Sequence, residues 1–191
     1  MNQSVERQRP LMKVGTYRSW SALRPDNERW ELIAGVPAMM TPPTMRHQRI
    51  ASNLERLLNA GLDRIGAPLE AFQRVGVNLG VEYYDPEPDV VVVDRPSRSD
   101  QRYADRFHLA AEVVSSSDER LLDDKCQLCR NHPHCLCILL IRQDRTEVVC
   151  ETRSPAGTWT RLTLTNPDDE LIVETVGLRC LAKDLYSGTM S

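Results

Sequence analysis

Three charged side chains occupy apolar segments, where an ionised group is costly. Glu112 interrupts the apolar run of residues 108–114, and Asp89 immediately precedes four consecutive valines. Lys125 lies three and four residues from the apolar positions of a predicted helix, so it shares their buried side. A buried charge needs an opposite charge or hydrogen bonds, so we expect these groups to converge. Two carboxylates and an ammonium group in a partly dry cleft favour Mg²⁺ over zinc and indicate phosphodiester chemistry.

Each of these residues also has an ordinary structural explanation. Glu112 can point to the solvent side of a half-buried strand, because alternate strand residues face opposite ways. Asp89 can act as a turn residue at the entry to a strand. Lys125 can lay its aliphatic stem on the core and extend its ammonium group to water. The sequence alone leaves these alternatives open.

Two predicted helices have to position the charged residues. Apolar residues at three- and four-residue steps predict a long helix at residues 44–65. A second helix is expected to end at residue 130 and to be capped by Ser117 or Asp118. A short first helix is expected at residues 16–23, with Thr16 as its N-cap.

Strand patterns fill most of the remaining chain. A hairpin is predicted from two apolar segments, residues 28–33 and 36–40, separated by Ala34-Gly35. The fold class is therefore α/β or α+β, a central mixed sheet flanked by helices and extended by C-terminal strands. Further strands are predicted at residues 69–72, 75–79, 90–93, 108–114, 135–141, 146–151, 158–164 and 171–174, and a final helical turn at residues 181–186.

Composition limits the class of protein. The chain has 191 residues, and 41% of them are hydrophobic, which is typical of one globular domain. We interpret residues 1–15 as a flexible N-terminal leader and residues 16–191 as a single domain. The longest apolar run is much shorter than a membrane span and no signal-peptide core is evident, so we expect a cytoplasmic protein that does not contact a membrane.

The net charge of −3 means that nucleic-acid binding would depend on local arginines. Such arginines occur between the Asp89 and Glu112 segments. They either face phosphate or belong to a solvated loop balanced by neighbouring aspartates. The four residues concerned are Arg95, Arg98, Arg102 and Arg106.

Five blocks in order resemble the Uma-type restriction endonuclease family of the PD-(D/E)XK nuclease superfamily. The position two residues after Glu112, where that superfamily usually has its lysine, holds Val114; in this branch the lysine is displaced to the following helix. The resemblance spans about residues 17–141 and implies a restriction-endonuclease-like core. The blocks are residues 30–36, 42–48, 87–93 and 111–118, followed by Lys125.

The resemblance implies roles for individual residues. Asp89 and Glu112 would ligate Mg²⁺ or Mn²⁺, with the Val113 carbonyl as a further ligand. Lys125 would orient the attacking water or offset charge on the phosphate. Glu31 falls in one of the similar blocks and would assist the metal, although a carboxylate on a surface strand is an alternative.

Two further features are open to more than one interpretation. His47 is either a hydrogen-bonded core histidine or a contact to substrate or to a metal ligand. Cysteines and histidines between Cys126 and Cys137 replace the segment that the family usually has after the lysine, and they provide soft ligands for zinc or simply small apolar side chains.

We therefore expect a metal-dependent endonuclease that hydrolyses DNA and works as a homodimer when both strands are cut. The first alternative is a catalytically inactive binding or regulatory module that keeps the nuclease fold. The second is a small zinc protein built on the cysteine cluster. The sequence has no glycine-rich phosphate loop and no serine-hydrolase elbow, so those two chemistries have no support.

Overall fold

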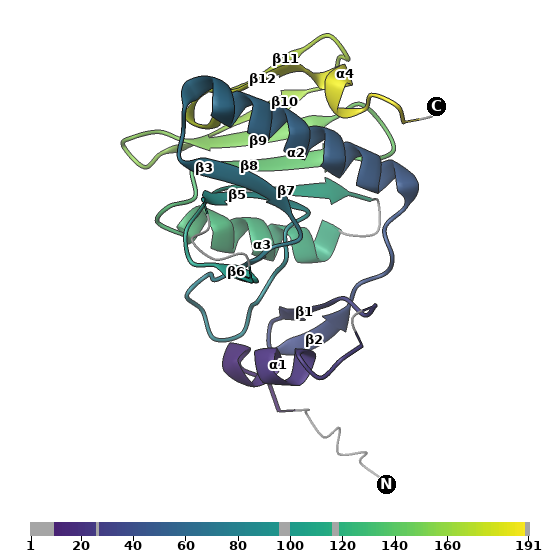
Figure 1. The fold of residues 1–191 in the computed structure, drawn as a ribbon, viewed down its shortest axis with the longest axis vertical. Coiled ribbons are helices and arrows are strands. Elements are labelled where there is room, and N and C mark those ends of the chain that lie inside the picture. The colour runs from purple at the N-terminus through teal and green to yellow at the C-terminus, as the bar shows by residue number, and fades with distance from the viewer. Residues whose placement is uncertain (1–9, 26, 96–99, 116–118, 190–191) are drawn as a thin grey trace, which may run out of the picture.

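The protein is built around a six-stranded mixed sheet (Figure 1). A computed structural model describes residues 10–25, 27–95, 100–115 and 119–189. The strand order is β10-β9-β8-β7-β5-β3. The bounds of these strands along the chain are β3 Leu69–Gln73, β5 Val90–Asp94, β7 Phe107–Val114, β8 Cys137–Arg142, β9 Val148–Arg153 and β10 Trp159–Leu164.

One pair of neighbouring strands, β7 and β8, is parallel, and every other neighbouring pair in this sheet is antiparallel. Parallel neighbours need a crossover connection, which helix α3 (Glu119–Asn131) provides. The longer helix α2 (Met45–Ile65) covers the opposite face. The predicted central mixed sheet flanked by these two helices is confirmed.

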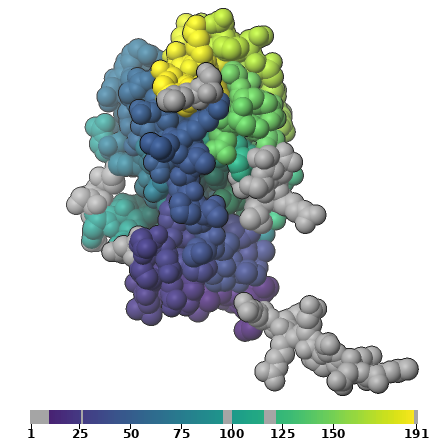
Figure 2. Space-filling view, turned by 90° about the vertical axis from the view of Figure 1, so that its right-hand side faces the viewer, coloured from purple at the N-terminus to yellow at the C-terminus, as the bar shows by residue number. Residues whose placement is uncertain are grey.

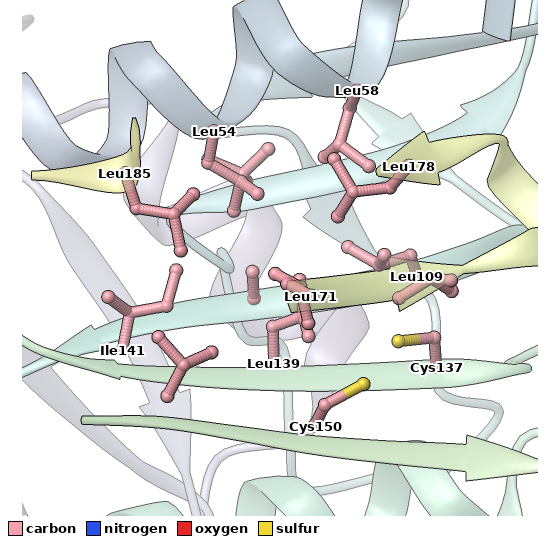
Figure 3. Close-up of a cluster of buried hydrophobic side chains, with 14 of the residues drawn as sticks. Leu54, Leu58, Leu109, Cys137, Leu139, Ile141, Cys150, Leu171, Leu178 and Leu185 are labelled. Atoms are coloured by element: carbon pink, nitrogen blue, oxygen red, sulfur yellow. The ribbon is translucent and has the colours of Figure 1, made fainter. Parts of the chain in front are cut away.

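The valine run of β5 shows how the sheet is covered on both sides. Val90 and Val92 belong to the apolar cluster beneath α2, whereas Val91 and Val93 belong to the cluster beneath α3. Figure 3 shows the α2 cluster, in which Leu54 lies above side chains of the sheet. A strand that is buried on both faces has no solvent side, which explains why its sequence is continuously apolar.

Helix α2 has clear signals at both ends. The Thr44 side chain accepts a hydrogen bond from the His47 backbone N–H at 3.1 Å, which caps the N-terminus. Gly66 adopts a left-handed conformation (φ 65°) just after the last turn. The predicted helix therefore has the expected ends.

A C-terminal unit packs against α2. It contains strands β11 (Glu170–Val173) and β12 (Leu178–Leu181), a 3₁₀ turn η1 (Glu174–Val176) and helix α4 (Ala182–Leu185). Helix and unit approach closely at Gly61, where an added Cβ would lie 2.5 Å from the Gly177 carbonyl oxygen.

A separate lobe lies at the lower end of the molecule (Figures 1 and 2). It consists of helix α1 (Val14–Ser21) and a hairpin of β1 (Trp30–Ile33) and β2 (Val36–Met39). Ala34 and Gly35 both have positive φ, as a two-residue hairpin turn requires.

Residues 85–88, which we call the strap, lead to the start of β5 and form hydrogen bonds with this lobe. The backbone groups of Asp85 and Leu32 exchange two hydrogen bonds, and the Pro86 carbonyl accepts one from the Val77 N–H. The strap therefore holds the hairpin beside the point at which β5 begins.

Several predicted elements needed correction. Helix α1 begins at Val14 after Lys13, so Thr16 is not its N-cap and two residues assigned to the leader are helical. The strand predicted at residues 75–79 is only the pair Gly76–Val77 (β4), which joins β6 (Tyr103–Ala104) in a small parallel sheet. Strands β6 and β12 and the turn η1 were not predicted. The proposed caps Ser117 and Asp118 and most of the leader, residues 1–9, lie outside the described residues.

Candidate active site

Strand register brings Asp89 to Glu112. In the antiparallel β5–β7 pair Val90 lies opposite Ala111. Asp89, which directly precedes β5, is therefore adjacent to Glu112. Asp89 accepts a hydrogen bond from the Val113 backbone N–H at 2.9 Å, which fixes the carboxylate at this edge. Glu112 alternates with residues of the α2 cluster and so belongs to the α3 face of the sheet.

Lys125 on α3 links two carboxylates from different parts of the fold. Its Nζ lies 2.7 Å from Glu31 Oε2 on β1 and 3.4 Å from Glu112 Oε1 on β7. Glu31 is 2% exposed and its other oxygen accepts a hydrogen bond from the Glu87 N–H of the strap at 2.9 Å. Glu31 is thus a buried member of the cluster, and the alternative of a surface carboxylate does not describe it.

Asp89 also contacts a histidine. His47 Nε2 on the first turn of α2 lies 3.1 Å from Asp89 Oδ2. Burial alone would raise the pKa of Asp89, but the hydrogen bond and charge of His47, with the Val113 N–H and Lys125, lower it below its usual value. Asp89 is therefore stabilised as a carboxylate, and His47 contacts the residue that was predicted to bind the metal.

Burial and neighbouring charges shift the pKa values of Glu112 and Lys125. Burial raises the pKa of Glu112 to about 8; Lys125 acts to lower that pKa, whereas Asp89 and Glu31 raise it further. Burial alone would lower the pKa of Lys125, but the attraction of Glu112 and Glu31 outweighs it and raises that pKa above its usual value. The site therefore has a shortage of positive charge that Lys125 only partly supplies.

These residues line a cleft of about 300 Å³ between the hairpin lobe and the sheet. Sequence reasoning missed several side chains on its walls, among them Arg29, Glu87 and Gln143. Gln143 had a usable signal, since it directly follows β8, and the carboxyl ends of the parallel strands β7 and β8 share one sheet edge. Arg29 and Glu87 had none, because their place depends on how the hairpin meets the strap.

The three described arginines between Asp89 and Glu112 do not form one group. Arg95 and Arg106 are largely exposed and pair with neighbouring carboxylates at 3.9 and 3.1 Å, as the solvated-loop interpretation expected. Arg102 lines a different cavity, and Arg98 lies outside the described residues.

The cysteine cluster is divided by the sheet. Cys126, Cys129 and Cys135 belong to the apolar cluster beneath α3, whereas Cys137 belongs to the cluster on the other face. Burial raises the pKa of Cys126 to about 11 and that of Cys135 to about 12, which disfavours the thiolates that zinc requires. The His132 ring stacks on Phe107 at 4.3 Å. This arrangement favours the apolar interpretation of the cluster over a zinc site.

The donor atoms around Asp89 suit a hard cation. Within the described chain no group of three or more His, Cys, Asp or Glu side chains is placed to hold a metal on its own. The contacts given above, all with described residues, use only Oδ2 of Asp89 and Oε1 of Glu112. Proteins usually bind Mg²⁺ through one or two carboxylates, and water and phosphate supply the other ligands. Asp89 and Glu112 therefore fit such an ion.

Comparisons with known proteins identify a matching family model and a solved structure with a similar fold. Residues 14–182 match the model of the Uma2 family, described as putative restriction endonucleases. A crystal structure from Anabaena variabilis, described as a putative nuclease belonging to DUF820, superposes with a TM-score of 0.71 at 18% identity, covering 89% of this chain and 96% of that one. This likeness shows a shared fold. No curated protein matches the chain. No helix among the described residues is long and apolar enough to cross a membrane.

Proposed function

Because this chain belongs to the Uma2 family, we propose that it is a metal-dependent endonuclease that hydrolyses DNA phosphodiester bonds. The observation that carries the proposal is the meeting of Asp89, Glu112 and Lys125 in one cleft, with Lys125 3.4 Å from Glu112. Asp89 directly precedes β5, and Glu112 and Lys125 lie on β7 and α3, so the core of the fold positions all three.

Asp89 and Glu112 would hold Mg²⁺ or Mn²⁺ through the oxygens that the contacts with described residues do not use, with the Val113 carbonyl as a further ligand. Such an ion, when bound, lowers the pKa of a coordinated water and offsets charge on a phosphate. His47 would keep Asp89 ionised and oriented through the 3.1 Å contact. The high pKa of Glu112 is consistent with this role, because a carboxylate surrounded by acids gains most from an added cation.

Lys125 would stabilise negative charge that develops on the phosphate, or would hold the attacking water. Its Nζ already lies in the cleft, and Glu31 holds it there from the opposite side. A buried ammonium group in a water-poor site stabilises developing charge more strongly than one in water. Glu31 would then act by positioning Lys125 as well as by adding negative charge near the cation.

Cleavage of supercoiled plasmid in Mg²⁺ or Mn²⁺ tests the proposal, with Asp89→Ala and Lys125→Ala purified identically. Nicking should require metal and be lost in both variants. Lys183→Ala is the matched control, because Lys183 is exposed and pairs with Asp168 far from the cleft. Equal nicking by the wild type and both cleft variants would refute the assignment.

The inactive-module alternative makes a different prediction in the same assay. If the wild type binds DNA but does not nick plasmid or single-stranded DNA in either metal, the retained fold serves binding. A homodimer is proposed only for double-strand cutting, which needs two active sites, and sedimentation of the protein on DNA tests it.

A further inference from the structure

A second cavity of about 450 Å³ adjoins the catalytic cleft and is rich in arginine. It lies between α1, the hairpin and the small β4–β6 sheet. Arg29 and Glu87 line both cavities, so this pair separates the second cavity from the catalytic cleft. The arginines on its wall are Arg24, Arg29, Arg74 and Arg102.

Most of these arginines form no ion pair with a carboxylate of the described residues. Arg74 and Arg102 are exposed and form no ion pair or side-chain hydrogen bond with the part of the chain that the structure describes. The Arg24 guanidinium lies over the Trp20 ring, 4.7 Å from its centroid, which orients it without neutralising it.

Each acid on the same wall has a partner, and Arg29 is the one wall arginine among these described partners. Asp85 is bound by Arg18 at 2.6 Å, and Glu87 is bound by Arg29 at 3.1 Å. Glu28 accepts a hydrogen bond from the Trp30 indole N–H at 2.8 Å. The wall thus has an excess of positive charge although the whole chain carries −3. A concave surface of one sign focuses its field and attracts ions of the opposite sign.

One buried donor in this region also lacks an acceptor. The Arg29 Nε–H is buried and has no hydrogen-bond partner among the described residues, although the same guanidinium contacts Glu87. An unsatisfied buried donor is costly, and an anion that reaches it recovers that cost. Arg29 therefore presents a donor at the boundary between the two cavities.

We propose that the second cavity binds backbone phosphates of the DNA strand next to the phosphate that is cleaved. Arg74 and Arg102 contact these phosphates, and Arg29 bridges from them to the catalytic cleft. A nucleic-acid strand presents phosphates at regular short intervals, so a strand in one cavity has further phosphates available to the adjoining one. This inference rests on the proposed nuclease function, because that function supplies the strand.

Fluorescence anisotropy with a short labelled DNA duplex, in EDTA so that no cleavage occurs, tests the proposal. The double variant Arg74→Ala/Arg102→Ala should weaken binding about tenfold and lower the slope of log affinity against log salt by about two. The double variant Arg56→Ala/Arg179→Ala removes the same charge from exposed positions on α2 and β12, away from the cavity, and should change binding less than twofold by this reasoning.

The outcomes separate the two proposals. Equal weakening by both double variants, or no DNA binding by the wild type, overturns the phosphate-binding cavity. Selective weakening by Arg74→Ala/Arg102→Ala supports it, even if the plasmid assay shows no cleavage and the nuclease proposal fails. Conversely, metal-dependent nicking that the cavity variant performs with an unchanged KM overturns the cavity while leaving the nuclease proposal intact.

Discussion

Lys125 Nζ on α3 lies 2.7 Å from Glu31 Oε2 on β1, so a helix beneath the central sheet is tied to a hairpin outside it. Glu31 is buried and Lys125 is 9% exposed. The contact therefore joins the two walls of the cleft through a nearly water-free ion pair. Stability and activity should both depend on it, but in distinguishable ways.

Glu31→Gln should lower the free energy of unfolding by about 1–3 kcal/mol, because Lys125 loses its carboxylate partner at 2.7 Å and keeps the one at 3.4 Å, Glu112. Nicking should fall about tenfold or more as the ammonium group loses its position. Urea denaturation and the plasmid assay measure the two effects, with the exposed Glu170→Gln as control. Adding Lys125→Met to Glu31→Gln should restore part of the stability but none of the nicking. An unchanged urea midpoint for Glu31→Gln would contradict this account.

Millimolar Mg²⁺ or Mn²⁺ should raise the melting temperature of the wild type and have little effect on Asp89→Asn or Glu112→Gln. An ion that binds only the folded protein stabilises it by about 2.7 kcal/mol at one hundred times its Kd, and each kcal/mol is worth about 2–4 °C at this chain length. Thermal unfolding after EDTA treatment, with and without added metal, measures the shift. A shift of the same size in all three proteins would place the ion elsewhere.

Stability should fall as pH falls below about 6.5, in part because of His132. Burial, with the charges of His134 and His108, lowers the pKa of His132 below its usual 6.5. The unfolded chain then takes up a proton at His132 before the folded protein does, so acid favours unfolding. His132→Phe keeps a ring against Phe107 and cannot titrate. Its unfolding free energy should depend less steeply on pH between about 6.5 and 5; parallel pH profiles would show that His132 titrates alike in both states.

Arg130→Ala should destabilise the protein by about 1–3 kcal/mol, whereas Arg145→Ala should have little effect. Arg130 holds the buried Glu151 through two hydrogen bonds, of 2.7 and 2.9 Å, and so fixes the last turn of α3 to β9. Arg145 is half exposed where it pairs with Glu147. Chemical denaturation compares the two variants, and amide hydrogen exchange should locate the loosened backbone in α3. Equal losses would mean that burial of Glu151 is not what makes the pair important.

Gly61→Ala should destabilise the protein by about 1–3 kcal/mol or more, since its Cβ would meet the Gly177 carbonyl and push β12 from α2. Gly15→Ala should instead stabilise it by about 0.5–1 kcal/mol, because Gly15 is helical and has open space around it. Thermal melts of the two variants should shift in opposite directions. A neutral Gly61→Ala would show that the unit containing β12 can move away without cost.

Charged residues in apolar segments made much of the site predictable from the sequence. Glu112 in an apolar strand and Lys125 on an apolar helix face could each be recognised as needing a partner. Glu31 was a candidate only through the family resemblance, because its contact with Lys125 depends on where a two-stranded hairpin docks, and no periodicity records that. The roles assigned to these residues stay predictions until the variants are measured.

The same contrast applies to the fold. Helix α2 and strand β5 have long, regular patterns and clear ends, so their sequences specify them. Strands β4 and β6 have two residues each and no period to detect. Helix α1 begins at Val14, and its N-cap residue Lys13 makes no side-chain capping bond; instead the Val14 N–H donates to the Glu82 carbonyl, a tertiary contact. Elements defined by contacts with distant segments were the ones missed or misplaced.

The strap also bears on the cost of ligand binding. Pro86 and Pro88 fix the backbone torsion φ at two of its four positions and restrict the residues before them, so this segment has few conformations even in the unfolded chain. Its remaining freedom is lost when it pairs with the hairpin during folding. Asp89 directly follows the strap, so the conformational entropy of ordering the backbone at this carboxylate is lost during folding, before any ligand binds. Affinity for a cation or a phosphate at Asp89 is therefore not reduced by ordering the backbone that carries it.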